Sequence, residues 1–152
     1  MVRSFTVSAL IWLTLLPPAV AQQTASAITS LQTARSLRCQ FPSEGIVVRS
    51  DGTVLHLKTS GTEAIFDSID HQHNRARLIG SIGATDVTVI VGSGSLTFVE
   101  LSATGNPHIT VVFARLQPGM RELVATDSEE FRDPVAGATV VSQYFGSCKV
   151  LE

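Results

Sequence analysis

The densest group of chemically versatile side chains lies at residues 67–73, which read Asp-Ser-Ile-Asp-His-Gln-His. On a strand, the His-x-His spacing places both imidazoles on one face, where they could bind a transition metal. A metal site needs at least a third ligand, and the sequence does not specify one. We therefore favour a polar connection between two apolar strands, and we predict no metal and no other cofactor.

A second candidate is Glu100, which ends the segment 96–100 (LTFVE). Strand alternation places Glu100 on the same face as Leu96 and Phe98, which is the more apolar face. A carboxylate inside a barrel would be a functional candidate because burial perturbs its pKa. We favour the simpler interpretation of an outward-turned residue near a strand end. His56 and His108 occupy strand positions and are expected to face solvent or to be hydrogen-bonded structural histidines.

Residues 92–95 (GSGS) could suggest a phosphate loop or a nucleophile elbow. They lack the GxxxxGK[ST] and GxSxG patterns, and no helix is predicted after them. We expect a hairpin tip instead. Nothing in the spacing favours a Ser-His-Asp arrangement, which is recognised by geometry. We therefore predict no catalytic residue, and a non-enzymatic protein is favoured over an enzyme.

The first 21 residues have the pattern of a secretory signal peptide. Arg3 is followed by an apolar run over residues 5–16 and by the small-x-small run Ala19-Val20-Ala21. The apolar run is shorter than the roughly 18 residues that a membrane-spanning helix needs. We expect residues 1–21 to be removed, leaving no membrane span, and the protein to be exported to the periplasm or the medium.

The charge balance argues against a nucleic-acid partner. Removal of Arg3, the one charged residue of the signal segment, leaves 10 Lys and Arg against 13 Asp and Glu, a net charge of −3. Affinity for a phosphate backbone depends on clustered basic side chains, and the chain has no basic run.

The two cysteines, Cys39 and Cys148, predict one disulfide. Exported proteins fold in an oxidising compartment, and an even count leaves no thiol unpaired. The bridge would close a loop of about 110 residues, for which the chain-entropy model gives a stabilisation of about 4 to 5 kcal/mol.

The remainder of the chain predicts an all-β fold. Residues 22–36 are small and polar and are expected to form a flexible leader, and residues 37–152 a single β domain. From Leu37 onward, turn signals recur every 9 to 13 residues or so, separated by segments rich in β-branched and aromatic residues. These segments are 53–58, 63–69, 75–82, 87–91, 96–101, 108–113, 122–126 and 139–145. The longest expected excursion is an acidic loop at residues 127–133.

This spacing favours a small antiparallel meander of about eight strands. Closure into an up-and-down barrel removes exposed strand edges and is our first choice, with a two-sheet β-sandwich as the alternative.

Three segments carry a resemblance to a known group of proteins: 96–100 (LTFVE), Gly105-Asn106 with 110–113 (TVVF), and 142–148 (SQYFGSC). In these segments the chain resembles a group of short exported bacterial proteins with cysteines near both ends of the mature chain. The group has no assigned activity, so the resemblance gives no residue a role.

These observations predict an exported, non-enzymatic β-barrel that binds either a small apolar ligand or an envelope protein. The alternative is a metal-dependent or hydrolytic enzyme that uses the segment 67–73, with Asp67, Asp70, His71 and His73 converging around a cavity and Glu100 as a further candidate.

Overall fold

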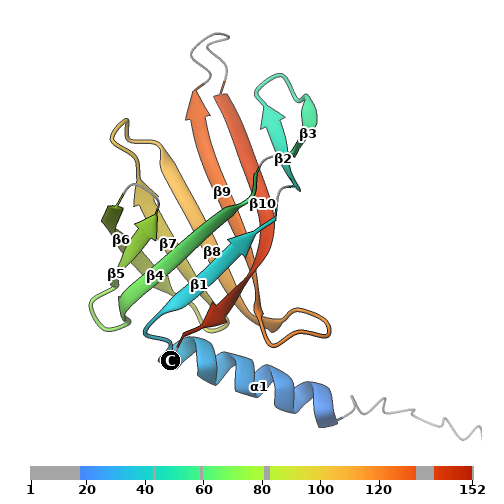
Figure 1. Cartoon of the computed structure of the whole chain (residues 1–152), viewed down its shortest axis with the longest axis vertical. Coiled ribbons are helices and arrows are strands. Elements are labelled where there is room, and N and C mark those ends of the chain that lie inside the picture. Colours follow the sequence, from blue (N-terminus) through green and yellow to red (C-terminus); the bar gives the residue numbers. More distant parts are fainter. Residues whose placement is uncertain (1–17, 43, 59, 81–82, 133–138, 152) are drawn as a thin grey trace, which may run out of the picture.

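The computed structural model describes residues 18–42, 44–58, 60–80, 83–132 and 139–151. Within them the chain forms one helix and ten strands (Figure 1). The elements are α1 (Pro18–Thr33), β1 (Leu37–Phe41), β2 (Glu44–Arg49), β3 (Val54–Lys58), β4 (Thr62–Asp70), β5 (Arg75–Gly80), β6 (Gly83–Val91), β7 (Ser95–Leu101), β8 (Pro107–Leu116), β9 (Leu123–Arg132) and β10 (Thr139–Val150).

The strands form one antiparallel sheet that closes on itself. The strand order is β1-β4-β5-β6-β7-β8-β9-β10-β2-β3, and β1 also pairs with β10. The result is a closed eight-stranded barrel with two extra strands, β2 and β3. The predicted antiparallel barrel is confirmed, and the sandwich alternative is not the fold.

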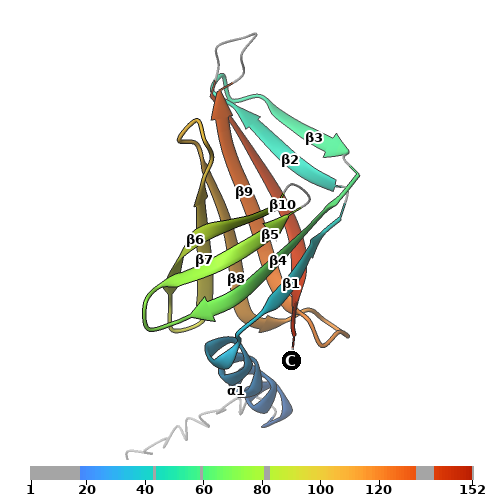
Figure 2. The same cartoon turned by 60° about the vertical axis from the view of Figure 1, so that its left-hand side comes forward.

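The extra strands prolong one side of the barrel wall. β1 ends at Phe41 and β2 begins at Glu44, and both strands pair with β10, so that Gln40 lies opposite Ser147 and Gly45 opposite Tyr144. β3 pairs with β2 in the same way that β4 pairs with β1. We call the level at which the partner of β10 changes from β1 to β2 the wall break. Figure 2 shows the β2–β3 hairpin rising beside the upper part of β10.

Alternation of apolar and polar residues builds the core, as expected. In β1 the side chains of Leu37, Cys39 and Phe41 are buried, while Arg38 and Gln40 between them are exposed. Side chains at alternate strand positions point to opposite faces, so one face of every strand lines the barrel interior.

The lower half of the interior is filled with apolar side chains. Phe66 of β4 and Phe98 of β7 stack across it with ring centroids 3.9 Å apart. The buried residues around them are Leu37, Cys39, Phe41, Ile69, Ala76, Val87, Val89, Leu96, Val112, Ala114, Leu123, Ala125 and Cys148. This half therefore holds a packed core.

Helix α1 closes the lower end of the barrel and lies against β8 and β7 (Figure 1). Ala27 and Leu31 of the helix and Ala34 just after it are buried at 2 to 3% exposure, and their spacing places them on one helical face. The expectation of a flexible leader at residues 22–36 is therefore wrong.

The predicted signal peptide lies largely at residues 1–17, which are outside the described residues. The expected cleavage after Ala21 falls inside α1 and would leave Ala27 and Leu31 in the mature chain. Among the residues described here, no helix is long and apolar enough to cross a membrane.

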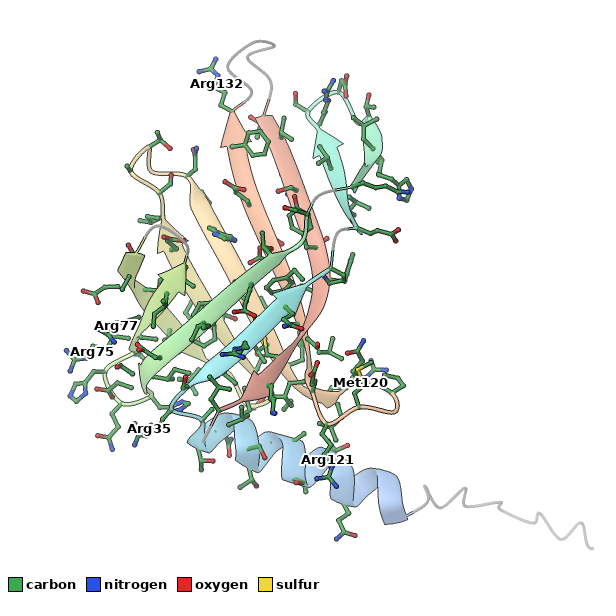
Figure 3. The ribbon with its side chains drawn as sticks, in the orientation of Figure 1. Arg35, Arg75, Arg77, Met120, Arg121 and Arg132 are labelled. Carbon is green, nitrogen blue, oxygen red and sulfur yellow. A yellow bond between two sulfur atoms is a disulfide. The ribbon has the colours of Figure 1, made fainter. Side chains whose placement is uncertain are left out.

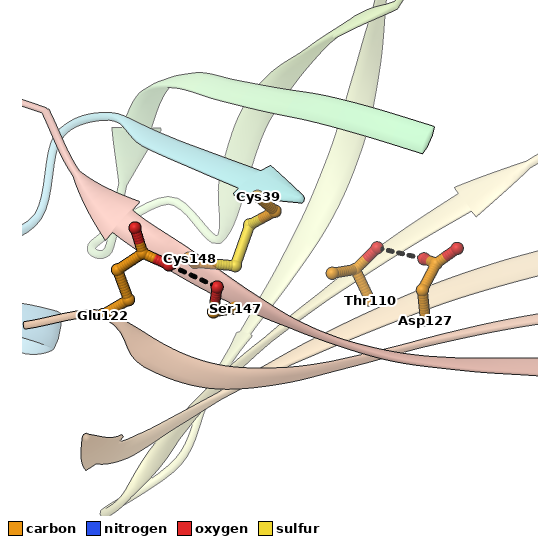
Figure 4. Close-up of a disulfide and its surroundings, with 6 residues drawn as sticks. All are labelled: Cys39, Thr110, Glu122, Asp127, Ser147 and Cys148. Atoms are coloured by element: carbon orange, nitrogen blue, oxygen red, sulfur yellow. Dashed lines mark hydrogen bonds between the residues drawn. A yellow bond between two sulfur atoms is a disulfide. The ribbon is translucent and has the colours of Figure 1, made fainter. Parts of the chain in front are cut away.

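The predicted disulfide is confirmed. Cys39 of β1 and Cys148 of β10 lie directly opposite one another and are bonded, with Cα atoms 4.0 Å apart (Figure 4). Because β1–β10 is the pairing that closes the barrel, the disulfide fastens the closing seam. A disulfide of this kind is compatible with an exported protein.

Candidate functional site

The inner face of the barrel changes character halfway along its length. In the lower half, Phe98 and Val112 are at most 2% exposed. Above them, the side chains of His108 and Glu100 are 34% and 27% exposed, and Leu55 of β3 is 41% exposed. All of these residues lie on the inner face, so solvent reaches the upper half of the interior. We call this part the open half.

The open half begins at a buried ion pair. His108 of β8 places its Nε2 atom 2.9 Å from both carboxylate oxygens of Asp127 on β9. The hydroxyl of Thr110 donates to the same carboxylate at 2.6 Å (Figure 4). The Asp127 side chain is only 9% exposed, and a carboxylate this deeply buried requires such partners.

Cross-strand register brings two further carboxylates to His108. Glu100 on β7 and Glu129 on β9 are its direct neighbours on either side. The Oε2 atom of Glu100 lies 3.4 Å from the Nδ1 atom of His108. The three acidic residues, His108 and Thr110 thus form one continuous surface on the inner face, which we call the acidic wall.

The hydrogen bond with Asp127 raises the pKa of His108 to about 9, and the charges of Asp127, Glu129 and Glu100 act in the same direction against the cost of burial. His108 is therefore protonated at neutral pH, and the acidic wall carries three negative charges and one positive. A protonated imidazole cannot accept a proton, so His108 is unsuited to act as a general base near pH 7.

Aromatic and apolar side chains continue the acidic wall on the same face. Tyr144 of β10 is paired with Asp127, and Phe131 follows Glu129 two positions along β9. Val47 of β2 is buried beside Ser142. Arg49, one step closer to the tip of the β2–β3 hairpin, is exposed.

The segment 67–73 is divided by a bulge. The register of β4 against β5 shifts between Asp67 and Asp70, and Ser68 adopts a φ of 52° there. The bulge turns Ile69 into the core, where it is 1% exposed. Asp67 forms a bidentate ion pair with Arg77, with N–O distances of 2.8 and 2.9 Å, and this pair holds the pKa of Asp67 below its usual value.

The remaining residues of this segment form a turn, as the favoured interpretation predicted. The carboxylate of Asp70 accepts hydrogen bonds from the ring and the backbone N–H of His73, which lower the pKa of Asp70 to about 2. His71 Nε2 lies 2.8 Å from the carbonyl oxygen of Ala34. Asp70, His71 and His73 line a pocket of about 430 Å³ together with Arg35, whose positive charge opposes a metal ion.

Three of the proposed metal ligands, Asp70, His71 and His73, line this pocket, but the other two do not. Glu100 belongs to the acidic wall, and Asp67 does not line this pocket. Within the part of the chain that the structure describes, no group of three His, Cys, Asp or Glu side chains is placed to hold a metal ion.

Sequence reasoning singled out two members of the acidic wall, Glu100 and His108, and missed the other three. Glu100 does lie on the face of Leu96 and Phe98, so the outward orientation that we favoured is wrong. His108 is a hydrogen-bonded histidine, as expected, and His56 is exposed. Asp127 was assigned to an acidic loop, whereas it lies within β9, which extends to Arg132.

The signal that could have found Asp127 was the alternation of β9 itself. Leu123 and Ala125 are buried on the inner face, and the same period of two continues to Asp127, Glu129 and Phe131. A change from apolar to acidic residues within one alternating series marks the level at which the packed core ends.

The chain matches no protein-family model, no curated protein and no solved structure. The resemblance to short exported bacterial proteins therefore stays a prediction, and the candidate site rests on its own geometry.

Proposed function

We propose that this chain is an exported, non-enzymatic binding protein that holds a small organic cation in the open half of its barrel. The observation that carries the proposal is the acidic wall, where three carboxylates lie around one imidazolium and leave a net charge of −2 on the wall itself. A partly desolvated surface of this charge attracts cations more strongly than the same charges in water.

The neighbouring side chains favour an organic cation over a bare ion. Phe131 and Tyr144 are half-buried on the same face as Asp127 and Glu129, and aromatic rings attract cations through their faces. A ligand with an ammonium group and an apolar part would satisfy both kinds of side chain.

A small apolar ligand has less support, because the apolar part of the interior is occupied by the Phe66–Phe98 stack and its neighbours. An enzyme at the segment 67–73 also has less support. Asp67 is paired with Arg77, Asp70 is bonded to the turn that follows it, and neither carboxylate is left free to bind a metal or activate a nucleophile.

The test uses a pair of molecules that differ only in charge. Choline and 3,3-dimethyl-1-butanol have the same shape, and the quaternary nitrogen of choline keeps its charge at every pH. Titration of each into the oxidised protein, followed by amide NMR shifts, should show that choline binds more tightly and perturbs residues of the acidic wall. Equal affinity for the two molecules would refute recognition of charge.

Two adjacent glutamates supply the matched variants. Glu129 faces the interior and Glu130, the next residue of β9, faces outward. Glu129→Gln should weaken choline binding by about fivefold, corresponding to roughly 1 kcal/mol for a partly exposed charge, while Glu130→Gln leaves it unchanged. The same loss in both variants would show a general charge effect instead of a site.

A further inference from the structure

A wide cavity lies on the outer side of the barrel wall. It is an open groove of about 830 Å³ at the wall break, and it runs between the β8–β9 connection and the start of β4. We call it the outer groove. Its principal lining residues are Gln40, Glu63, Met120, Glu122, Phe145 and Ser147.

The groove follows from the topology of the wall. Glu63, Gln40, Ser147 and Val124 form one outward-facing row across four adjacent strands. Beyond this row β1 ends, and on this side of β10 pairing resumes only where Tyr144 lies opposite Gly45 of β2. The wall is interrupted between these levels, and the groove lies over the interruption.

A glycine among the lining residues lets β1 and β10 approach one another closely. A Cβ atom added at Gly146 would collide with the carbonyl oxygen of Gln40 and with the ring of Phe41. β1 and β10 therefore approach so closely here that only glycine fits between them.

Two large apolar side chains flank the groove and are exposed. Phe145 of β10 and Met120 of the β8–β9 connection are each 55% exposed, and Figure 3 shows Met120 standing out from its loop. Exposed phenylalanine and methionine side chains at one concave site are typical of surfaces that bind a partner.

The charged groups of the groove are all negative. Glu122 accepts a hydrogen bond from the hydroxyl of Ser147 (Figure 4), and Glu63 accepts one from the amide of Gln40 at 3.4 Å. These donors are neutral, so they leave both carboxylate charges in place. No Lys, Arg or His is among the described lining residues, and the cation paired with Glu63, Arg38, lies 4.0 Å away outside the lining.

We propose that the outer groove binds an extended polypeptide segment in which a basic side chain stands beside an apolar one. The basic residue would meet Glu63 or Glu122, and the apolar residue would cover Phe145 and Met120. The groove is open along its length, which suits a chain passing through it better than a small molecule that must be enclosed. The amides of Gln40 and Gln117 can bond to the peptide backbone.

The probe is a set of fluorescein-labelled, capped hexapeptides: GFRLKG, its charge-reversed form GFELEG, and the apolar-depleted form GSRSKG. Fluorescence anisotropy with the full mature protein should show GFRLKG binding at least tenfold more tightly than either of the others. Amide NMR should place the shifts at Gln40, Val124 and Ser147. Comparable binding of GFELEG would overturn the proposal, as would shifts confined to other surfaces.

Matched variants distinguish binding in the outer groove from non-specific binding to exposed apolar side chains. Phe145→Ala should weaken binding at least tenfold, whereas Ile90→Ala, at an outward position of β6 that is 56% exposed, should have no effect. Glu122→Gln should weaken binding about threefold, and Glu130→Gln should not. Equal losses in Phe145→Ala and Ile90→Ala would overturn the proposal.

Two other occupants are outcomes of the same experiments, and each would overturn the proposal. Full displacement of GFRLKG by arginine amide alone would assign the groove to a small cation. A dimer in sedimentation that Phe145→Ala dissociates would assign it to a second copy of this chain.

Discussion

The two halves of the barrel are built from the same alternating strands, but their interiors differ. In the lower half, Leu37 and Val112 have no measurable exposure, and α1 covers the end. In the open half, the same strand β8 presents His108 with a third of its side chain exposed. The difference lies in the residue types at the inward positions and in what covers each end.

This contrast separates stability from binding. Apolar burial in the lower half stabilises the fold by about 25 cal/mol for each Å² removed from water. The acidic wall gathers three carboxylates on one surface, which is unfavourable for folding unless each has a partner. A sequence selected for stability alone would not place like charges next to one another. Clustered carboxylates are therefore more typical of a ligand-binding site, where function is maintained at some cost in stability.

Removal of the disulfide, which lies in the lower half, should have the largest effect on the free energy of unfolding. The bond joins residues 109 apart and fastens the seam that closes the barrel. Replacing Cys39 and Cys148 together by alanine should lower the free energy of unfolding by about 4 to 5 kcal/mol, chiefly because the unfolded chain gains freedom. Urea denaturation measures the change. The reduced wild-type protein is the control and should behave like the double variant; a loss below about 1 kcal/mol would show that packing alone holds the seam.

A phenylalanine from each half tests the comparison directly. Phe98→Ala removes one partner of the central stack, where the side chain is 2% exposed, and should cost about 3 to 4 kcal/mol. Phe131→Ala, on the inner face of the open half, should cost less than about 1.5 kcal/mol because its ring is already partly in water. Both values come from denaturant unfolding. Similar costs for the two variants would contradict the division of the barrel into a packed half and an open half.

The features that local patterns encode were predicted from the sequence. Alternation in β1 placed Leu37, Cys39 and Phe41 inside, and the cysteine count gave the disulfide. The turn signals set the strand count closely enough to predict the closed meander. Each of these predictions depends on the strand period of two, on turn residues such as glycine and proline, or on the two cysteines, which have only one possible pairing.

The features that depend on contacts between distant segments were not predicted. Helix α1 has only modest amphipathicity, and its burial depends on packing against β7 and β8, which the helical segment itself does not reveal. The pairing of His108 with Asp127 depends on the register of β8 against β9. That register shifts between Val112 and Leu116, so it does not follow from counting residues back from the β8–β9 connection. The outer groove depends on β1 and β2 sharing β10, a relationship across about 100 residues.

The smallest expected effect concerns the pH dependence of stability, and it comes from the open half. The pKa of His108 rises from 6.5 to about 9 on folding, so the folded protein binds more protons than the unfolded chain between these values. The stabilisation from the His108–Asp127 pair is therefore complete below about pH 6.5 and is lost as the pH rises through 9. Because a third of the side chain is exposed, we expect a loss of about 1 to 2 kcal/mol.

Denaturant unfolding at intervals from pH 6 to 10 measures this loss, and His108→Gln supplies the comparison. The variant should be less stable than the wild type at pH 6, because Asp127 then lacks its charged partner, and the two proteins should approach one another near pH 10. A wild-type profile that stays flat between pH 6.5 and 9 would show that His108 is neutral in the folded protein. The acidic wall would then carry a net charge of −3 at neutral pH, and choline should bind it with the same affinity across this range.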